Sequence, residues 1–104
     1  MWAQLITMQL KPGKDGDLID LIKQIHAVEQ PQSGLVRSTA MRDQKNPNRI
    51  YYLVVFESEE KARARELDPV REEALGPARA LMAEILEGPP EFVDLSVVQE
   101  TSGR

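Results

Sequence analysis

The apolar residues of this chain follow two spacings, an alternation typical of strands and a three-to-four-residue repeat typical of helices. Residues 2–11 alternate loosely and carry few charges, so they predict a strand that ends at the turn formed by Pro12 and Gly13. Asp17 is then placed to cap a helix, because its carboxylate can accept the free N–H groups of a first turn. One apolar stripe follows, made of Leu18, Leu21, Ile22, Ile25 and Val28.

Two further strands and a broken helical region come next. Residues 35–42 are mixed in character, whereas residues 50–56 are β-branched or aromatic almost throughout and form the strongest predicted strand. Ser58 is placed to cap the second helical region. Pro69 and Pro77 interrupt this region, so we expect two or three helical pieces.

The last strand is predicted over residues 91–99, after a Gly-Pro-Pro break, and residues 101–104 are predicted to be a flexible C-terminal tail. The resulting order, β-α-β-β-α-β, predicts an α+β, ferredoxin-like antiparallel sheet with both helices on one face. No internal repeat or linker appears, so residues 1–100 are expected to form a single domain.

The strand over residues 50–56 is apolar on both faces, with Tyr52 on one and Tyr51 on the other. Two helices can cover only one face, and the other would expose an apolar patch of roughly several hundred Å², more than a monomer usually tolerates. We therefore expect a homodimer in which two sheets pack face to face. The alternative is that loops lightly cover Tyr51 and its neighbours.

Composition narrows the possible partners and chemistry. Of 104 residues, 41% are hydrophobic and 29% charged, and the net charge of −4 argues against nucleic acid or an anionic membrane as a partner. The opening residues lack the features of a secretory signal, and we expect a cytoplasmic protein. There is no cysteine and only one histidine, so no metal site is expected.

Four segments in order along the chain resemble antibiotic biosynthesis monooxygenase (ABM) domains. They are a lysine-proline-glycine turn, the turn between the middle strands, a glutamate-serine entry to the second helical region and the start of the last strand. The segments are 10–14 (LKPGK), 43–49 (DQKNPNR), 56–60 (FESEE) and 89–91 (PPE). The resemblance covers roughly residues 2–100 and implies a dimeric α+β barrel.

This family includes cofactor-independent oxygenases that act on aromatic polyketides or quinols, and a branch that binds and degrades heme. The heme branch carries an asparagine on the first strand, where this chain has Ile6, and a histidine on the second helix, where it has none. Other members carry histidines near the Pro69 bend, where this chain has Arg65 and Val70. Since neither residue supplies a neutral imidazole to iron, heme binding is disfavoured.

Few side chains are candidates for catalysis. His26 could act as an acid or base near neutral pH, although a histidine at a helix boundary is more often a packing residue. Tyr51 or Tyr52 could hold or deprotonate a quinol-like substrate, but not both in one pocket, because they face opposite sides of the sheet. Both could also be ordinary core tyrosines.

The candidate substrate-binding residues lie on the first strand and among the arginines. Trp2, Gln4 and Ile6 share one strand face, which could line an apolar cavity with one orienting amide or could simply be core. Arg37 and Arg65 could bind a carboxylate or phenolate oxygen. A solvated charged face of helical ion pairs is the alternative for Arg63, Arg65, Glu66, Arg71 and Glu72.

The resemblance implies a small monooxygenase that needs no cofactor beyond molecular oxygen as co-substrate. Its substrate would be an aromatic or polycyclic quinol or phenol, bound between the helices and the sheet. The alternative is a non-catalytic ligand-binding or dimerisation protein of the same fold. Departures at the family's histidine positions favour this alternative, and the implied roles of individual residues remain hypotheses.

Overall fold

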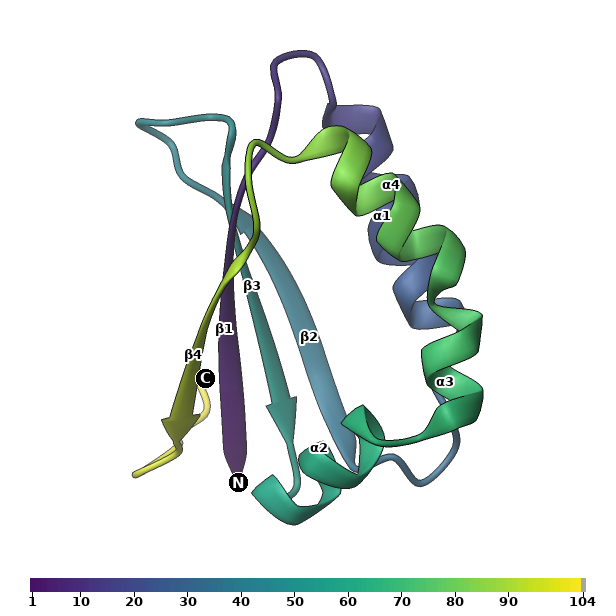
Figure 1. Cartoon of the computed structure of the whole chain (residues 1–104). Helices are drawn as coiled ribbons and strands as arrows, with labels where there is room; N and C mark the ends of the chain where they lie inside the picture. Colours follow the sequence, from purple (N-terminus) through teal and green to yellow (C-terminus); the bar gives the residue numbers. More distant parts are fainter. Residues whose placement is uncertain (104) are drawn as a thin grey trace.

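The computed structural model describes residues 1–103, in which four strands and four helices follow in the order β1-α1-β2-β3-α2-α3-α4-β4 (Figure 1). The strands are β1 (Trp2–Gln9), β2 (Leu35–Arg42), β3 (Arg49–Phe56) and β4 (Glu91–Ser96); the helices are α1 (Asp15–Ala27), α2 (Glu59–Glu66), α3 (Pro69–Ala74) and α4 (Gly76–Ile85). The predicted order is confirmed, and the second helical region forms three pieces. The predicted tail ends at Arg104, which lies outside the described residues.

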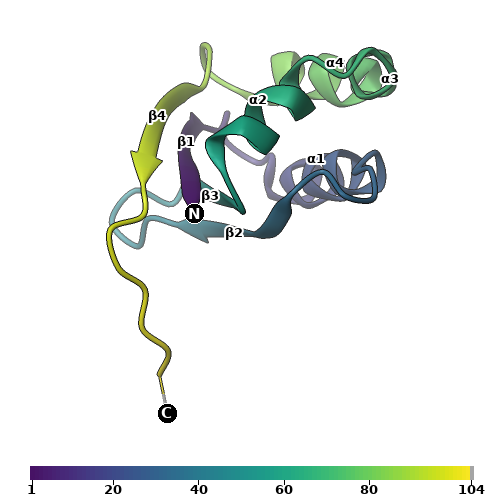
Figure 2. The same cartoon turned by 90° about the horizontal axis from the view of Figure 1, so that it is seen from below.

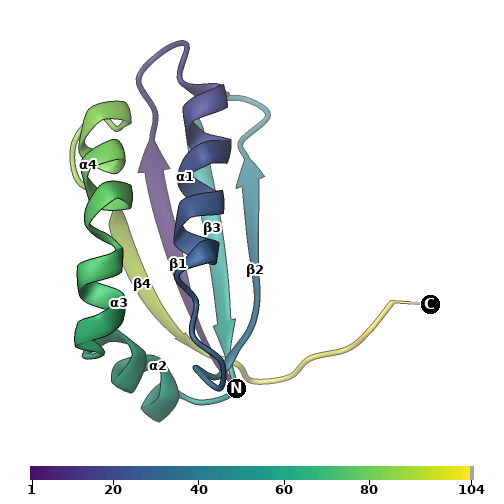
Figure 3. The same ribbon diagram turned by 90° about the vertical axis from the view of Figure 1, so that its right-hand side faces the viewer.

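The strands form one antiparallel sheet in the order β2-β3-β1-β4. Figure 3 shows α1 in front of the central strands. The consecutive helices α3 and α4, together called the α3–α4 arm, lie in front of the β4 edge. All the helices lie on the same side of the sheet (Figure 1). The predicted ferredoxin-like α+β fold, with its helices on one face, is therefore confirmed.

Strand register explains where the core lies. Ile6 lies opposite Tyr52 and Met8 opposite Ile50, so these side chains share the face toward the helices. From the helix side, the apolar stripe of α1 packs on this face through Leu18. The largest fully buried side chains are Leu10, Leu21, Ile50 and Ile85.

The predicted cap at Asp17 is wrong. Helix α1 begins two residues earlier, at Asp15, and the N–H of Leu18 donates to the carbonyl of Lys14 at 3.0 Å. Lys14 occupies the cap position, and no side chain caps this helix. Asp15 and Asp17 instead lie in the first turn, where their charges favour the positive end of the helix dipole. The cap predicted at Ser58 is confirmed, because its Oγ accepts the N–H of Lys61 at 3.2 Å.

The last strand is shorter than predicted, since β4 ends at Ser96 and not at residue 99. Ser96 pairs with Trp2, the first residue of β1, so only Met1 precedes Trp2 as a backbone partner for a longer strand. Val97 donates one further hydrogen bond to the carbonyl of Met1, Glu100 then pairs with Arg37 of β2, and the chain beyond β4 extends away from the sheet (Figure 2). At its other end, β1 is likewise shorter than the predicted 2–11.

The second face of the sheet carries no helix (Figure 2). Its edges expose apolar side chains, with Met41 44%, Val93 48% and Leu95 38% exposed. Near β2, a loop partly covers Tyr51, as the alternative to a dimer predicted. The Tyr51 hydroxyl donates to Asp43 in the β2–β3 turn at 3.3 Å. The two edges of this face therefore differ, and its β4 side remains bare. Within residues 1–103 no helix is both long and apolar enough to cross a membrane.

Candidate functional site

A cavity of about 570 Å³ lies between the helices and the covered face of the sheet. Its volume is within the range of small-molecule sites in proteins. Apolar side chains from both layers dominate the lining. They include Ile6, Met8, Ile22, Ile25, Leu35, Val54, Phe56, Leu75, Met82 and Phe92.

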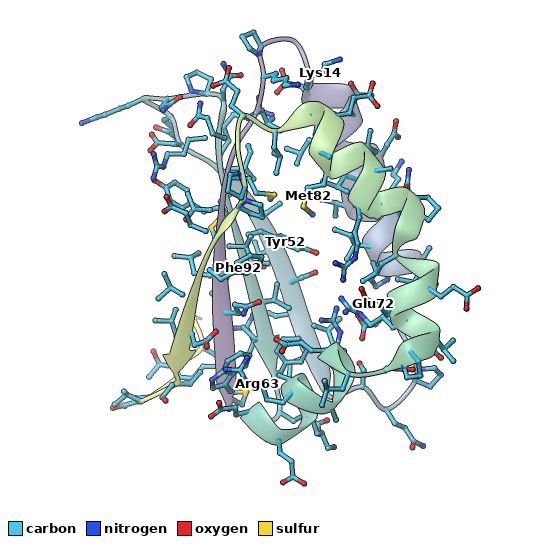
Figure 4. The ribbon with its side chains drawn as sticks, viewed as in Figure 1. Lys14, Tyr52, Arg63, Glu72, Met82 and Phe92 are labelled. Atoms are coloured by element: carbon cyan, nitrogen blue, oxygen red, sulfur yellow. The ribbon has the colours of Figure 1, made fainter. Side chains whose placement is uncertain are left out.

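The cavity has an apolar end and a charged end. Met8 and Met82 mark the apolar end beside α4, and Figure 4 shows Met82 projecting from that helix toward the sheet. Arg65 of α2, Arg71 of α3 and Glu29, just after α1, mark the charged end. A ligand that fits this space would combine an apolar body with polar or charged groups at one end.

Tyr52 and His26 both line the cavity, from β3 and from the last turn of α1. Only 6% of Tyr52 is exposed, and within residues 1–103 its hydroxyl donates no hydrogen bond, unlike that of Tyr51. Figure 4 shows Tyr52 on the sheet, across the space from the helices. The structure therefore separates the two tyrosines, with Tyr52 at the cavity and Tyr51 on the opposite face.

The first-strand candidates occupy different places. Gln4 and Ile6 line the cavity, but the Gln4 amide already donates to Asp94 Oδ1 at 3.0 Å. Trp2 shares their strand face without lining the cavity; it is buried against Phe56, with ring centroids 6.0 Å apart. Arg63 stacks on the Trp2 ring at 4.9 Å from its centroid and closes this end of the sheet.

Asp94 is held by two of these neighbours. Arg63 donates to its Oδ2 at 2.8 Å, and this hydrogen bond, together with that from Gln4, lowers the pKa of the Asp94 carboxyl. The pKa of Arg63 is raised for the same reason. Gln4 is therefore fixed by a surface network and presents a positioned amide to the cavity.

Arg37 lies away from the cavity. Its register partner is Val55, whose side chain is on the uncovered face, and it pairs with Glu100 at 3.1 Å. The structure therefore does not bring Arg37 together with His26 and Tyr52.

Arg65 and Glu29 form a bidentate ion pair at the charged end. Arg65 Nε lies 3.1 and 3.0 Å from the two carboxylate oxygens, and a terminal guanidinium nitrogen lies 2.7 Å from Oε1. Burial by itself raises the pKa of the Glu29 carboxyl, but hydrogen bonds from Arg65 and Ser33 and the nearby positive charges outweigh it, so the pKa is lowered. Arg65 also stacks on Phe56, at 5.0 Å from the ring centroid.

Arg71 is the functional candidate that sequence reasoning missed. The predicted solvated face is wrong for Arg65 and Arg71, since both turn toward the cavity. The Nε of Arg71 is buried without a hydrogen-bond partner, and within residues 1–103 the side chain forms no salt bridge. Burial and the neighbouring Arg65 charge lower the pKa of Arg71, and Glu29 offsets this in part. The sequence offered one signal for this residue: Arg71 comes two positions after Pro69, which breaks the helical region.

Few side chains near the cavity carry donor atoms suited to a metal ion. Among residues 1–103, no three histidine or carboxylate side chains come together as a metal site would require. His26 is the chain's single imidazole, so the cavity can supply at most one. Near the Pro69 bend, Arg65 is already engaged by Glu29, and Val70 has no donor atom.

Comparison with solved structures identifies the same architecture in distant proteins. Two structures of the cofactor-independent oxygenase SnoaB from Streptomyces nogalater give TM-scores of 0.75 and 0.74 at 14% and 16% identity, respectively. Each comparison covers 95% of this chain and 94% of that chain. A protein from Chloroflexus aurantiacus, described as a candidate antibiotic biosynthesis monooxygenase, gives 0.66 at 23% identity and 98% coverage of both chains. At these identities the likeness establishes the fold alone.

A third structure, of a conserved protein from Methanosarcina mazei, gives a TM-score of 0.72 at 17% identity and covers 91% of each chain. The comparison with curated proteins finds no match. The sequence itself matches the family model "Antibiotic biosynthesis monooxygenase" over residues 1–69, about two thirds of the chain. The chain therefore belongs to the antibiotic biosynthesis monooxygenase family.

Proposed function

We propose that this protein is a cytoplasmic, cofactor-independent monooxygenase that oxidises an aromatic quinol or phenol held between the helices and the sheet. The observation that carries this function is the apolar cavity of about 570 Å³, which is lined by the buried Tyr52 and by the exposed His26. A space of this size accepts a fused-ring molecule, and its apolar walls favour one. Family membership and the fold shared with SnoaB, described as a cofactor-independent oxygenase, are consistent with this chemistry.

The reaction needs a substrate that can form an electron-rich anion. For an anthrone-type molecule, a base removes a proton from the CH₂ group opposite the carbonyl, and the anion passes one electron to O₂. The two radicals combine at that carbon, and the proton returns to the peroxide oxygen. Loss of water then leaves a second carbonyl, so that one CH₂ group and one O₂ give one C=O group and one H₂O.

The roles of the side chains follow from their places in the cavity. His26 lines the cavity, and an imidazole within reach of the bound substrate can act as the base that accepts the proton in the first step. The hydroxyl of Tyr52 can donate to the oxygen on which charge develops, and a site with little water strengthens such a bond. The amide of Gln4 supplies a fixed polar contact. Trp2 and Arg37 lie outside the cavity and are not part of the proposed site.

Oxygen uptake with a panel of quinols and anthrone tests the function directly. With ¹⁸O₂, the proposed reaction places one labelled atom in the product and one in water for each O₂ consumed. The control is the uncatalysed rate in the same buffer, because such phenols also oxidise slowly by themselves. Uptake at the buffer rate on every member of the panel would contradict the oxygenase function and favour a non-catalytic ligand-binding protein.

We also propose that two copies of the chain pack through their uncovered sheet faces. The β4 side of this face exposes Val93 and Leu95, which a single chain leaves in water. A second copy supplies a face of the same composition, as a two-fold dimer requires. Sedimentation at micromolar concentration gives the mass, and a monomer there would contradict the dimer.

A further inference from the structure

We propose that Arg71 binds a carboxylate on the ligand, so that the cavity takes an apolar ring system carrying an acidic group at one end. This inference rests on the proposed ligand cavity and adds the chemical class of what binds there. The carboxylate would be separate from the group that reacts with oxygen, because it lies at the charged end, whereas the ring system occupies the apolar body of the cavity.

The first observation is that Arg71 has no partner of its own. Among the three arginines that line the cavity, Arg65 is held by Glu29, and Arg79 is held by Glu72 at 2.7 Å. Within residues 1–103, Arg71 makes no such pair, and its Nε is buried without an acceptor. The guanidinium that carries this Nε lines the cavity, so a ligand carboxylate there would meet a cation that no side-chain ion pair of residues 1–103 neutralises.

The second observation is the charge balance of the cavity. Three arginines line it against two carboxylates, Glu29 and Glu66, and Glu66 already accepts from Arg63 at 3.3 Å. Burial, and after it the Arg65 charge beside Arg71, disfavour a second unbalanced cation and lower the pKa of Arg71. One negative charge on the ligand would balance the excess.

The third observation is the arrangement of the charged end. Glu29, Arg65 and Arg71 line the cavity and also a second hollow of about 210 Å³ beside residues 30–33. The ion pair holds Glu29 at fixed distances from Arg65, so this carboxylate is not free to turn to Arg71. The Arg71 guanidinium therefore stays unpaired, and a guanidinium can bind a carboxylate through two parallel hydrogen bonds.

A carboxylate fits this end better than a phosphate. A phosphate ester carries up to two charges and is usually met by several donors, often a row of backbone N–H groups at a glycine-rich turn. The charged end provides one unpaired arginine and no glycine among its lining residues. The single excess charge therefore matches a singly charged acid.

Equilibrium binding under argon tests this inference without any turnover. The probes are 9-anthracenecarboxylate and the neutral 9-anthracenemethanol, which share a ring system and are both followed by fluorescence. We expect the wild-type chain to bind the carboxylate at least roughly tenfold more tightly, as for a charge-assisted hydrogen bond. Equal affinity for the two probes, or no saturable binding of the carboxylate, would overturn the inference.

Three variants sharpen the test. Arg71→Met should remove the preference for the carboxylate and leave the neutral probe within about twofold, as expected when only a charged contact is lost. Glu29→Gln should act in the opposite direction and strengthen carboxylate binding, because it frees Arg65. Arg42→Met, at an exposed pair with Asp15 outside the cavity lining, is the matched control and should change neither affinity.

If Arg71→Met weakens both probes equally, the arginine supports the cavity wall only and the inference fails. Circular dichroism establishes that this variant is folded; should it not fold, the wild-type probe pair and Glu29→Gln decide. Failure here is separable from failure of the oxygenase function. Carboxylate preference without oxygen uptake would keep the Arg71 site and remove the oxygenase, whereas uptake without the preference would do the reverse.

Discussion

Arg65 reaches from α2 to both carboxylate oxygens of Glu29, and these two side chains fasten the second helical region to the end of α1. Their side chains are only 12% and 13% exposed, whereas the other ion pairs within residues 1–103 are much more open to solvent. The contact joins residues 36 positions apart in the sequence at the charged end of the cavity. It therefore links stability to the shape of the candidate site.

Breaking this pair should destabilise the fold more than breaking a surface pair. We expect Glu29→Gln or Arg65→Met each to lower the free energy of unfolding by about 1–3 kcal/mol, because each leaves a partly buried charge without its partner. The double variant should show a coupling energy of about 1–2 kcal/mol in urea unfolding. The exposed pair Arg79–Glu72 is the control, and its coupling should not exceed about 0.5 kcal/mol. Equal coupling in both cycles would contradict the special role of Glu29.

Stability should also depend on pH through Glu29. Its pKa is lower in the folded chain than the ordinary 4.5, so the unfolded chain binds the proton more tightly. The contribution of Glu29 is therefore complete above that ordinary value and is lost as the pH falls through the lower, folded-state value. Urea unfolding across this acid range should give a flatter curve for Glu29→Gln than for the wild-type chain.

Some acid dependence should remain in that variant. The pKa of Asp43 is lowered by the backbone N–H of Lys45, and that of Asp94 by Arg63. Both carboxylates therefore lose stabilising interactions in the same direction as Glu29. A variant curve parallel to that of the wild-type chain would show that Glu29 makes no such contribution.

Much of the fold could be predicted from the sequence because its breaks have local causes. Pro12 and Gly13 form the turn that follows the first strand, and Ser58 begins the second helical region by accepting a backbone N–H group. At Pro69, the preceding Asp68 supplies the cap of α3 through a 3.0 Å bond to the N–H of Val70. Such interactions involve residues only a few positions apart, so the sequence displays them directly.

The charged end of the cavity could not be predicted in the same way. Arg65 and Arg71 lie on either side of Asp68, whose ψ of 114° is not helical, so helical spacing cannot be counted from one to the other. Both side chains line the cavity only because of how the α3–α4 arm is placed over the sheet. Glu29 lies after the last turn of α1, where no periodic pattern assigns it a face.

The two tyrosines of β3 provide a matched pair for the catalytic role. Tyr52→Phe removes the hydroxyl that faces the cavity and should lower the rate of oxygen uptake at least roughly tenfold, as the loss of a hydrogen bond to a developing charge does. Tyr51→Phe removes a hydroxyl on the opposite face and should leave the rate within about twofold. If both variants lower the rate of oxygen uptake equally, the Tyr52 hydroxyl has no specific catalytic role.

His26 is the expected base, and its replacement should affect turnover more than binding. His26→Gln keeps a polar side chain of similar reach but cannot accept the proton, so kcat should fall about a hundredfold with KM little changed. Lys23→Gln, an exposed change on the same helix that does not line the cavity, is the control and should preserve both constants. A rise in KM alone would assign His26 to substrate binding.

The uncovered sheet face makes its own prediction about assembly. Val93 lies on this face opposite Leu5, and Val93→Lys would place a charge within the proposed contact in both copies. Burying an ammonium without a partner costs several kcal/mol, so the dissociation constant should rise at least about a hundredfold. Leu67, 82% exposed between α2 and α3, is the control: Leu67→Lys introduces the same charge away from this face and should leave the sedimenting mass unchanged. A Val93→Lys chain that sediments like the wild-type protein while staying folded would mean that the dimer forms through another surface.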